Sequence, residues 1–167
     1  MSVDMARIRE TVVRYLQEQG VNAAAAWPGE PAVSVEKPVA VVSVQSCRAE
    51  AGSFLDYLGE RFDPDTGLWQ ELYGRRAEIT FGLDLWAPKG SSGADLQALF
   101  EQVSGALATG APDGLTVREL ACDETEYDSR HRLLKRKVRA VCGACLYAAV
   151  PAGETFLDFE LRGGLKA

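Results

Sequence analysis

Apolar residues recur at every second position between residues 75 and 88. The series comprises Ala77, Ile79, Phe81, Leu83 and Leu85, and mostly polar residues stand between them. A period of two places such side chains on one face of a β-strand. The pattern therefore predicts a strand over residues 75–88 with one buried face.

Two other segments repeat their apolar residues at helical spacing. The first covers residues 4–19 and ends before Gly20; its stripe is Met5, Ile8, Val12, Tyr15 and Leu16. The second covers residues 93–108 and stops at Gly110; its stripe is Leu96, Leu99, Phe100, Val103 and Leu107. Glycine is a frequent C-cap, and Ser92 with Asp95 three residues later is typical of a capping box. We predict two amphipathic helices.

The remaining regular segments read as strands. We expect a short edge strand near residues 21–27 before a proline-rich turn, and a strand over residues 39–50, which are rich in β-branched residues. Residues 114–150 predict a long β-hairpin with its tip near Asp128 and Ser129. A last strand is expected over residues 154–164, with Leu157, Phe159 and Leu161 on one face.

Residues 52–74 are apolar but show no steady period. Glycines and one proline interrupt their aromatic and aliphatic residues, which predicts an irregular loop. A loop this apolar either folds back on the core or presents an adhesive surface to a partner.

The order of these elements predicts the fold class. We expect a single α+β domain over residues 1–167, with a mainly antiparallel β-sheet, two α-helices packed on it and a long β-hairpin arm. The length of 167 residues is sufficient for one hydrophobic core without disulfides or a metal.

Charge and composition narrow the function. The net charge is −6 and the pI about 4.9, which argues against a protein that wraps duplex DNA. The N-terminal segment lacks the apolar region of a signal peptide, and no apolar run reaches the roughly 20 residues of a membrane span. We expect no membrane association and a reducing cytosol, in which the four cysteines are free thiols.

Cys142 and Cys145 form a C-G-x-C motif that raises the question of redox or metal chemistry. On a strand, side chains three positions apart point to opposite faces, so this pair could neither clasp one metal nor form a disulfide. A thioredoxin-like site needs its first cysteine at a helix N-terminus, and the flanks here are strand-like. We interpret both as small strand residues, and keep a thiol-disulfide oxidoreductase as the less favoured alternative.

No other catalytic, metal-binding or cofactor-binding constellation emerges. Phosphate-binding and nucleophile-elbow motifs are missing from the sequence, and the only histidine, His131, lies in a charged hairpin where we expect it to be exposed without an orienting partner. The sequence thus predicts a non-enzymatic protein without a cofactor.

Two segments are candidate interfaces. One is the aromatic segment, with Phe62, Leu68, Trp69, Leu72 and Tyr73. It either lines the core or anchors a partner, as Trp and Tyr often do. The other is the hairpin tip, with Glu124, Glu126, Tyr127, Arg130, Arg132 and Arg136. Its charges either pair across the hairpin or match complementary patches on neighbouring copies.

Residues 5–148 together resemble the tail terminator (tail completion) proteins of long-tailed phages and prophages. The resemblance rests on the first helix with "YLQEQGVNAAAAW", the strand "VAVVSVQSCRAE", the loop leading into "RRAEITFGLDLWAP", the helix "DLQALFEQVSGAL" and the charged hairpin. It implies a homo-oligomeric ring, often a hexamer, that caps the tail tube, stops its polymerisation and offers a docking face to the head connector. DNA would pass the lumen without specific binding, and a negative lumen repels phosphate.

The resemblance implies a structural role in the virion tail, after assembly in the bacterial cytoplasm, with the major tail tube protein and a head-closure protein as partners. It carries over no catalytic residue. Another head–tail connector or minor tail protein, and a host-encoded domain that binds a small ligand, remain alternatives. The resemblance assigns no role to residues 154–167.

Overall fold

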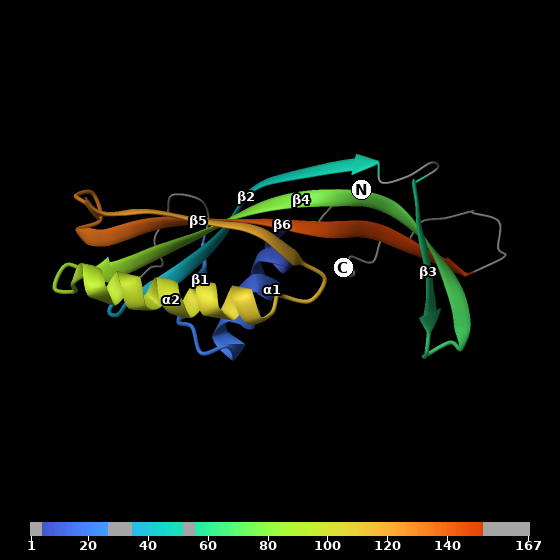
Figure 1. Cartoon of the computed structure of the whole chain (residues 1–167), viewed down its shortest axis with the longest axis horizontal. Helices are drawn as coiled ribbons and strands as arrows, with labels where there is room; N and C mark the ends of the chain where they lie inside the picture. Colours follow the sequence, from blue (N-terminus) through green and yellow to red (C-terminus); the bar gives the residue numbers. More distant parts are fainter. Residues whose placement is uncertain (1–4, 27–34, 52–55, 152–167) are drawn as a thin grey trace.

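The computed structural model describes residues 5–26, 35–51 and 56–151, which form two helices and one six-stranded sheet (Figure 1). The helices are α1 (Met5–Glu18) and α2 (Gly93–Thr109). The strands are β1 (Ala23–Ala25), β2 (Val39–Ala51), β3 (Tyr57–Asp63), β4 (Leu68–Pro88), β5 (Thr116–Asp128) and β6 (Leu133–Pro151).

The sheet is mainly antiparallel. Its order is β1-β2-β4-β6-β5, and β3 pairs with the first part of β4. Only β1 and β2 run parallel among these pairs; the others are antiparallel. The α+β class is therefore confirmed, and β1 occupies the edge position that the sequence predicts for it.

Both helices pack on the same face of the sheet, over one part of its length (Figure 1). Leu16 of α1 and Leu96 and Val103 of α2 are fully buried there. They meet the side chains of β4 at alternate positions, Ile79, Phe81, Leu83 and Leu85 among them. The predicted buried face of this strand is thus confirmed, because period-two burial follows directly from the pleat.

The ends of the helices agree with the capping signals. Gly20 takes the left-handed conformation, with φ of 81°, and the Val21 N–H donates to the Leu16 carbonyl at 2.9 Å. At α2, the Ser92 N–H donates to the Asp95 carboxylate at 2.7 Å. The Tyr15 hydroxyl donates to the Ala106 carbonyl at 2.7 Å and so ties α1 to the last turn of α2.

The expectation of an irregular loop over residues 52–74 is wrong for the described part. Residues 57–63 and 68–73 pair as an antiparallel hairpin, and β4 begins at Leu68 rather than near residue 75. Gly59, with φ of 127°, lies at a bulge, and Gly67, with φ of 70°, lies in the turn. These glycines interrupt the apolar period because they shape a bulge and a turn, not because the strands end there.

The hairpin over residues 114–150 forms, but its projection as a long arm is not confirmed. β5 and β6 pair antiparallel, and the turn between them comprises residues 129–132. The first residue of β6, Leu133, also pairs with Pro88 of β4. Since the hairpin is joined to the sheet along its return strand, it is part of the sheet and not a free arm. The strand expected over residues 154–164 lies outside the described residues.

The second face of the sheet holds a small cluster that the sequence pattern does not indicate. Trp86 is 1% exposed and packs with Val39 and Val41 on the face opposite the helices. It stands at a position that the alternation assigns to the polar face.

Candidate functional site

The sheet continues past the two helices at one end, where it carries β3 (Figure 1). We call residues 57–73, which comprise β3, the turn and the first part of β4, the distal hairpin. Four of the five large apolar side chains that are exposed in the described part of the chain lie here. They are Tyr57, Phe62, Leu68 and Trp69, with exposed fractions of 40%, 51%, 57% and 56%. The fifth is Tyr127.

The aromatic residues of the distal hairpin extend the face of the sheet that the helices cover elsewhere. Trp69 and Tyr73 have the same parity on β4 as the core residues Ile79 and Phe81, so they point to the same face. Phe62 pairs with Trp69 in register, with ring centroids 5.7 Å apart in an edge arrangement. Tyr57 and Tyr73 form a second edge pair at 5.5 Å. The apolar face of the sheet therefore continues beyond the part that α1 and α2 cover.

Acidic side chains flank these rings. Glu60 and Glu71 stand directly opposite each other on neighbouring strands, on the same face as the aromatic pairs. Like charges in this arrangement repel. Partial desolvation, together with the charges of Glu60 and Glu71, raises the pKa of the Tyr57 hydroxyl. Glu71 accepts a hydrogen bond from the Tyr73 hydroxyl at 2.7 Å, and neither glutamate has an ion pair among the described residues. The surface therefore combines exposed rings with negative charge.

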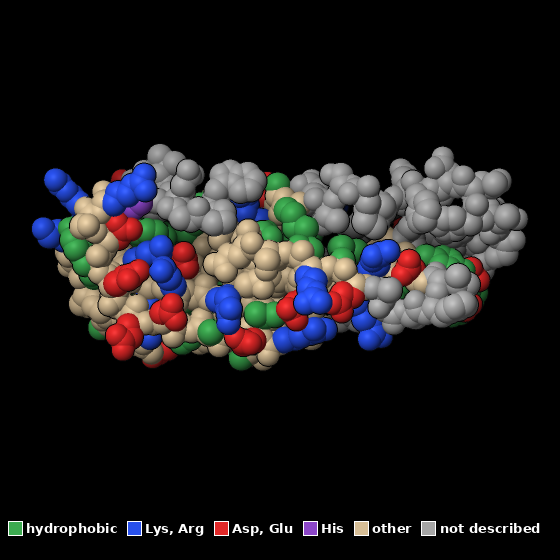
Figure 2. Space-filling model, turned by 90° about the horizontal axis from the view of Figure 1, so that it is seen from above, with side chains coloured by type: hydrophobic (Ala, Val, Ile, Leu, Met, Phe, Trp, Pro, Cys, Tyr) green, Lys and Arg blue, Asp and Glu red, His purple; other side chains and the backbone are tan. Residues whose placement is uncertain are grey.

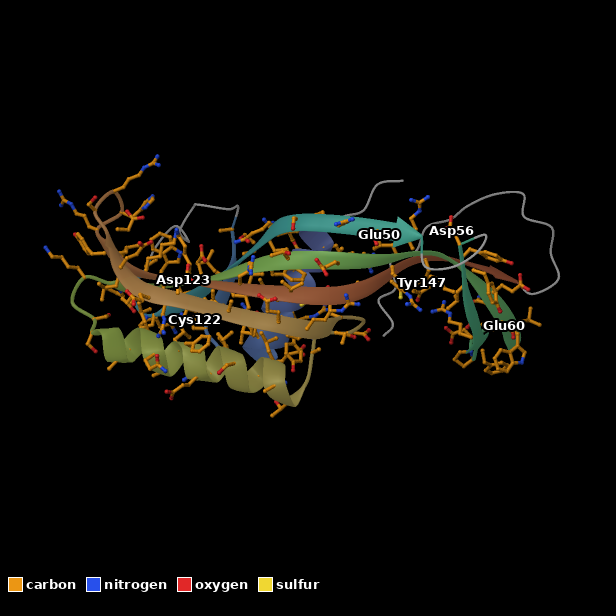
Figure 3. All side chains as sticks on the ribbon, turned by 45° about the horizontal axis from the view of Figure 1, so that its top comes forward. Glu50, Asp56, Glu60, Cys122, Asp123 and Tyr147 are labelled. Carbon is orange, nitrogen blue, oxygen red and sulfur yellow. The ribbon has the colours of Figure 1, made fainter. Side chains whose placement is uncertain are left out.

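The one arginine of the distal hairpin does not compensate this charge. The Arg61 side chain donates to Gln70 Oε1 at 3.1 Å and to the Tyr147 hydroxyl at 2.9 Å. Gln70 and Tyr147 belong to the opposite face of the sheet, so the guanidinium lies away from the two glutamates. Figure 3 shows Glu60 on β3, far from Cys122 and Asp123 of β5.

The structure thus places the five predicted residues of the aromatic segment in two settings. Phe62, Leu68 and Trp69 are exposed, whereas Leu72 and Tyr73 are half-buried. The two interpretations of this segment, core and surface, each apply to part of it.

The charged residues of the β5–β6 hairpin also lie in two settings, some paired across the hairpin and one in contact with α2. Lys137 approaches Glu126 at 3.9 Å across the hairpin, as the cross-strand interpretation expects. Arg136 donates to the Asp123 carbonyl at 2.8 Å and to Gln97 Oε1 at 2.6 Å, and lies over the Phe100 ring. It therefore fastens β6 to α2.

Arg130 and Arg132 differ from their neighbours. Both are exposed in the turn of residues 129–132, and neither side chain has an ion pair within the described ranges. Lys89, which follows β4 where that strand meets β6, is exposed as well. We call Lys89 and residues 129–132 the basic turn. Lys and Arg side chains gather at this end of the molecule (Figure 2). Tyr127 and Glu124 are exposed beside it.

His131 is more constrained than the sequence analysis expects. Its ring nitrogen Nδ1 lies 3.1 Å from Asp128 Oδ2, and its backbone N–H donates to Asp128 Oδ1 at 3.0 Å. The ring is partly buried against Trp86, at 5.6 Å between centroids. The hydrogen bond from the His131 N–H lowers the pKa of the Asp128 carboxyl. This pair closes the turn.

The cysteine pair lies on a strand, as predicted. Cys142 faces Ile79 in the core, and burial raises the pKa of its thiol to about 11. Cys145 lies opposite Arg76 at a position of the other parity, so the two sulfurs point to opposite faces. All four cysteines are free. No thiolate suited to redox chemistry is favoured at Cys142.

A polar hollow of about 570 Å³ lies on the face opposite the helices, lined in part by Asp84, Lys135, Lys137 and Arg139. Its cations are already paired. Lys135 lies 3.7 Å from Asp84 and above the Trp86 ring, and Arg139 lies 3.0 Å from Glu119. Burial raises the pKa of the Asp84 carboxyl, and the charge of Lys135 only partly opposes this. Lys135 and Arg139 are therefore engaged by carboxylates of the chain itself.

The sequence matches no protein-family model and no curated protein. The described ranges contain no group of three or more His, Cys, Asp or Glu side chains that could hold a metal. Neither described helix is long and apolar enough to span a membrane. The distal hairpin, with its exposed aromatic residues, and the basic turn, with its exposed cations, are the candidate contact surfaces of the described chain.

Proposed function

We propose that this protein is a structural component of a phage or prophage tail, which caps the end of the tail tube as a ring, stops tube polymerisation and provides the surface for joining the head. The observation that carries this proposal is the aromatic face of the distal hairpin. It extends the core face of the sheet, and neither of the two described helices lies over it.

Exposed aromatic side chains in register on a sheet are suited to a protein partner. Trp and Tyr bury a large area for little loss of side-chain entropy, and they dominate binding energy at interfaces. The partners in this proposal are other copies of the chain, the major tail tube protein and the head-closure protein. The resemblance of residues 5–148 to tail terminators supports the same assignment.

The overall charge is compatible with a ring around DNA. A net charge of −6 gives a lumen that repels phosphate, so that DNA can pass without being held. The place of action would be the virion tail, after assembly in the host bacterial cytoplasm.

The test is polymerisation of a phage tail tube protein, with and without the purified protein. We expect tubes of limited length that carry extra density at one end. Tubes of unchanged length with bare ends contradict the proposal. Binding to the portal or neck in place of the tube end would favour the other head–tail connector function.

A further inference from the structure

We propose that the distal hairpin of one copy binds the basic turn of the next copy, end to end, and that this contact is the lateral interface of the assembly. The inference rests on the proposed ring and adds which surfaces meet in it.

The distal hairpin and the basic turn carry opposite charge. The distal hairpin, residues 57–73, contains four carboxylates and one arginine, a net charge of −3. The basic turn contains Lys89, Arg130 and Arg132 and no carboxylate. Opposite potentials on two surfaces steer their encounter and fix their register.

Several charges at each end have no ion pair among the described residues. Arg61 is held on the far face by Gln70 and Tyr147, and Glu60 and Asp65 have no ion pair in the ranges that the structure describes. Arg130 and Arg132 likewise have none there. Other charges of the hairpin, such as Glu126 and Lys137, are paired. Each end thus carries charges without an ion pair in the described part of the chain, acidic on the distal hairpin and basic on the basic turn, with the exposed Glu124 beside the latter.

The two surfaces lie at opposite ends of one strand. β4 connects the two ends: Leu68 lies in the distal hairpin and Pro88 adjoins the basic turn. Twenty steps of a strand span about 65 Å, so the two surfaces cannot meet within one copy. Figure 1 places β3 and the β5–β6 turn at opposite ends of the long axis. A contact between two different surfaces of identical copies is heterologous, and such contacts generate rings when the rotation closes.

Each end also supplies apolar area to the contact. Phe62 and Trp69 are exposed beside Glu60, and Tyr127 is 48% exposed beside the basic turn. An arginine can pair with the carboxylates and lie on an aromatic ring at the same time. We expect Arg130 and Arg132 to be received between the Glu60–Glu71 pair and the two rings.

The experiment is a charge reversal at each end and at both ends. One variant is Arg130→Glu/Arg132→Glu, the second is Glu60→Lys/Asp65→Lys, and the third combines all four substitutions. Self-association is measured by sedimentation velocity, and occupancy of tube ends by electron microscopy. The control Arg14→Glu/Glu18→Lys reverses two exposed charges on α1, away from both ends.

We expect each double variant to weaken self-association or tube-end occupancy by at least about tenfold, because like charges then face each other. The variant with all four substitutions should recover most of the lost self-association and tube-end occupancy. The control should match the wild type. Circular dichroism and thermal unfolding establish that each variant is folded.

Two results separate this inference from the proposed function. Suppose that the wild type caps tubes as an oligomer. If the double variants then cap tubes equally well, or if the variant with all four substitutions does not recover self-association, the end-to-end contact is overturned while the ring remains. If the wild type stays a monomer both in solution and with tubes, both proposals are overturned.

Discussion

One face of the sheet is buried along part of its length and exposed along the rest. Beneath α1 and α2, Ile79 and Phe81 are at most 1% exposed. Ten positions before Ile79, on the same strand and the same face, Trp69 is 56% exposed. The alternating pattern of a strand therefore does not by itself decide which side chains are buried. Burial also requires that other elements, here the two helices, cover the face. We interpret the covered part as the stable body and the uncovered part as the contact surface.

The largest expected effect is loss of a core ring. Phe81→Ala removes a side chain that is 1% exposed beneath the helices, and should lower the free energy of unfolding by about 3–5 kcal/mol. Urea denaturation followed by circular dichroism measures it. A loss below about 1 kcal/mol would show that this part of the face is not the core.

Gly74 marks the junction between the two parts. A Cβ at this position would collide with the Leu146 carbonyl oxygen of β6, so Gly74→Ala should cost about 1–3 kcal/mol of stability through forced displacement of the strands. The matched control is Gly105→Ala in α2, where a Cβ meets no neighbouring atom. It should stabilise the helix by up to about 1 kcal/mol. Thermal unfolding of both variants checks the opposite signs.

Trp69→Ala sharpens the contrast with Phe81. The substitution removes one edge pair with Phe62 and should cost only about 1 kcal/mol of stability. Its effect on self-association or tube-end binding should be larger, at least about tenfold, as for a buried anchor of an interface. Urea denaturation and sedimentation velocity on the same preparation give both values. A stability loss equal to that of Phe81→Ala would contradict the assignment of this surface.

The smallest expected effect concerns Asp84, on the other face of the covered part. Its pKa is raised in the folded state, chiefly by burial, so the folded protein binds this proton more tightly than the unfolded chain does. Its contribution to stability is present at low pH and is lost as pH rises through the raised pKa. Relative to the wild type, Asp84→Asn should therefore gain stability as pH rises through that window. Parallel urea titrations at several pH values test it; a difference that falls with pH would contradict it.

The sequence predicts the covered part well, and for a physical reason. The helical stripes, the Ser92 cap and the period-two face of β4 are local patterns, and all three agree with the structure. The distal hairpin was missed because Gly59 and Gly67 break its period, although such glycines also mark bulges and turns. The placement of the acidic distal hairpin and the basic turn at opposite ends of the molecule could not be predicted, since only the strand register reveals it.

The sequence pattern also fails to predict burial on the face of β4 opposite the helices. Trp86 and Asp84 read as exposed positions of an alternating strand, yet Trp86 is fully buried and Asp84 is partly so. Their environment comes from β2 and β6, which are distant in sequence. A one-dimensional pattern carries no information about such neighbours.

Hydrogen–deuterium exchange of the free and the assembled protein tests the central claim most directly. We predict that, on assembly with tail tubes, protection rises in peptides covering residues 57–73 and 129–132 and stays unchanged in residues 77–87. Unchanged exchange at residues 57–73 in a verified assembly would contradict the account, because the uncovered face would then have no partner on it.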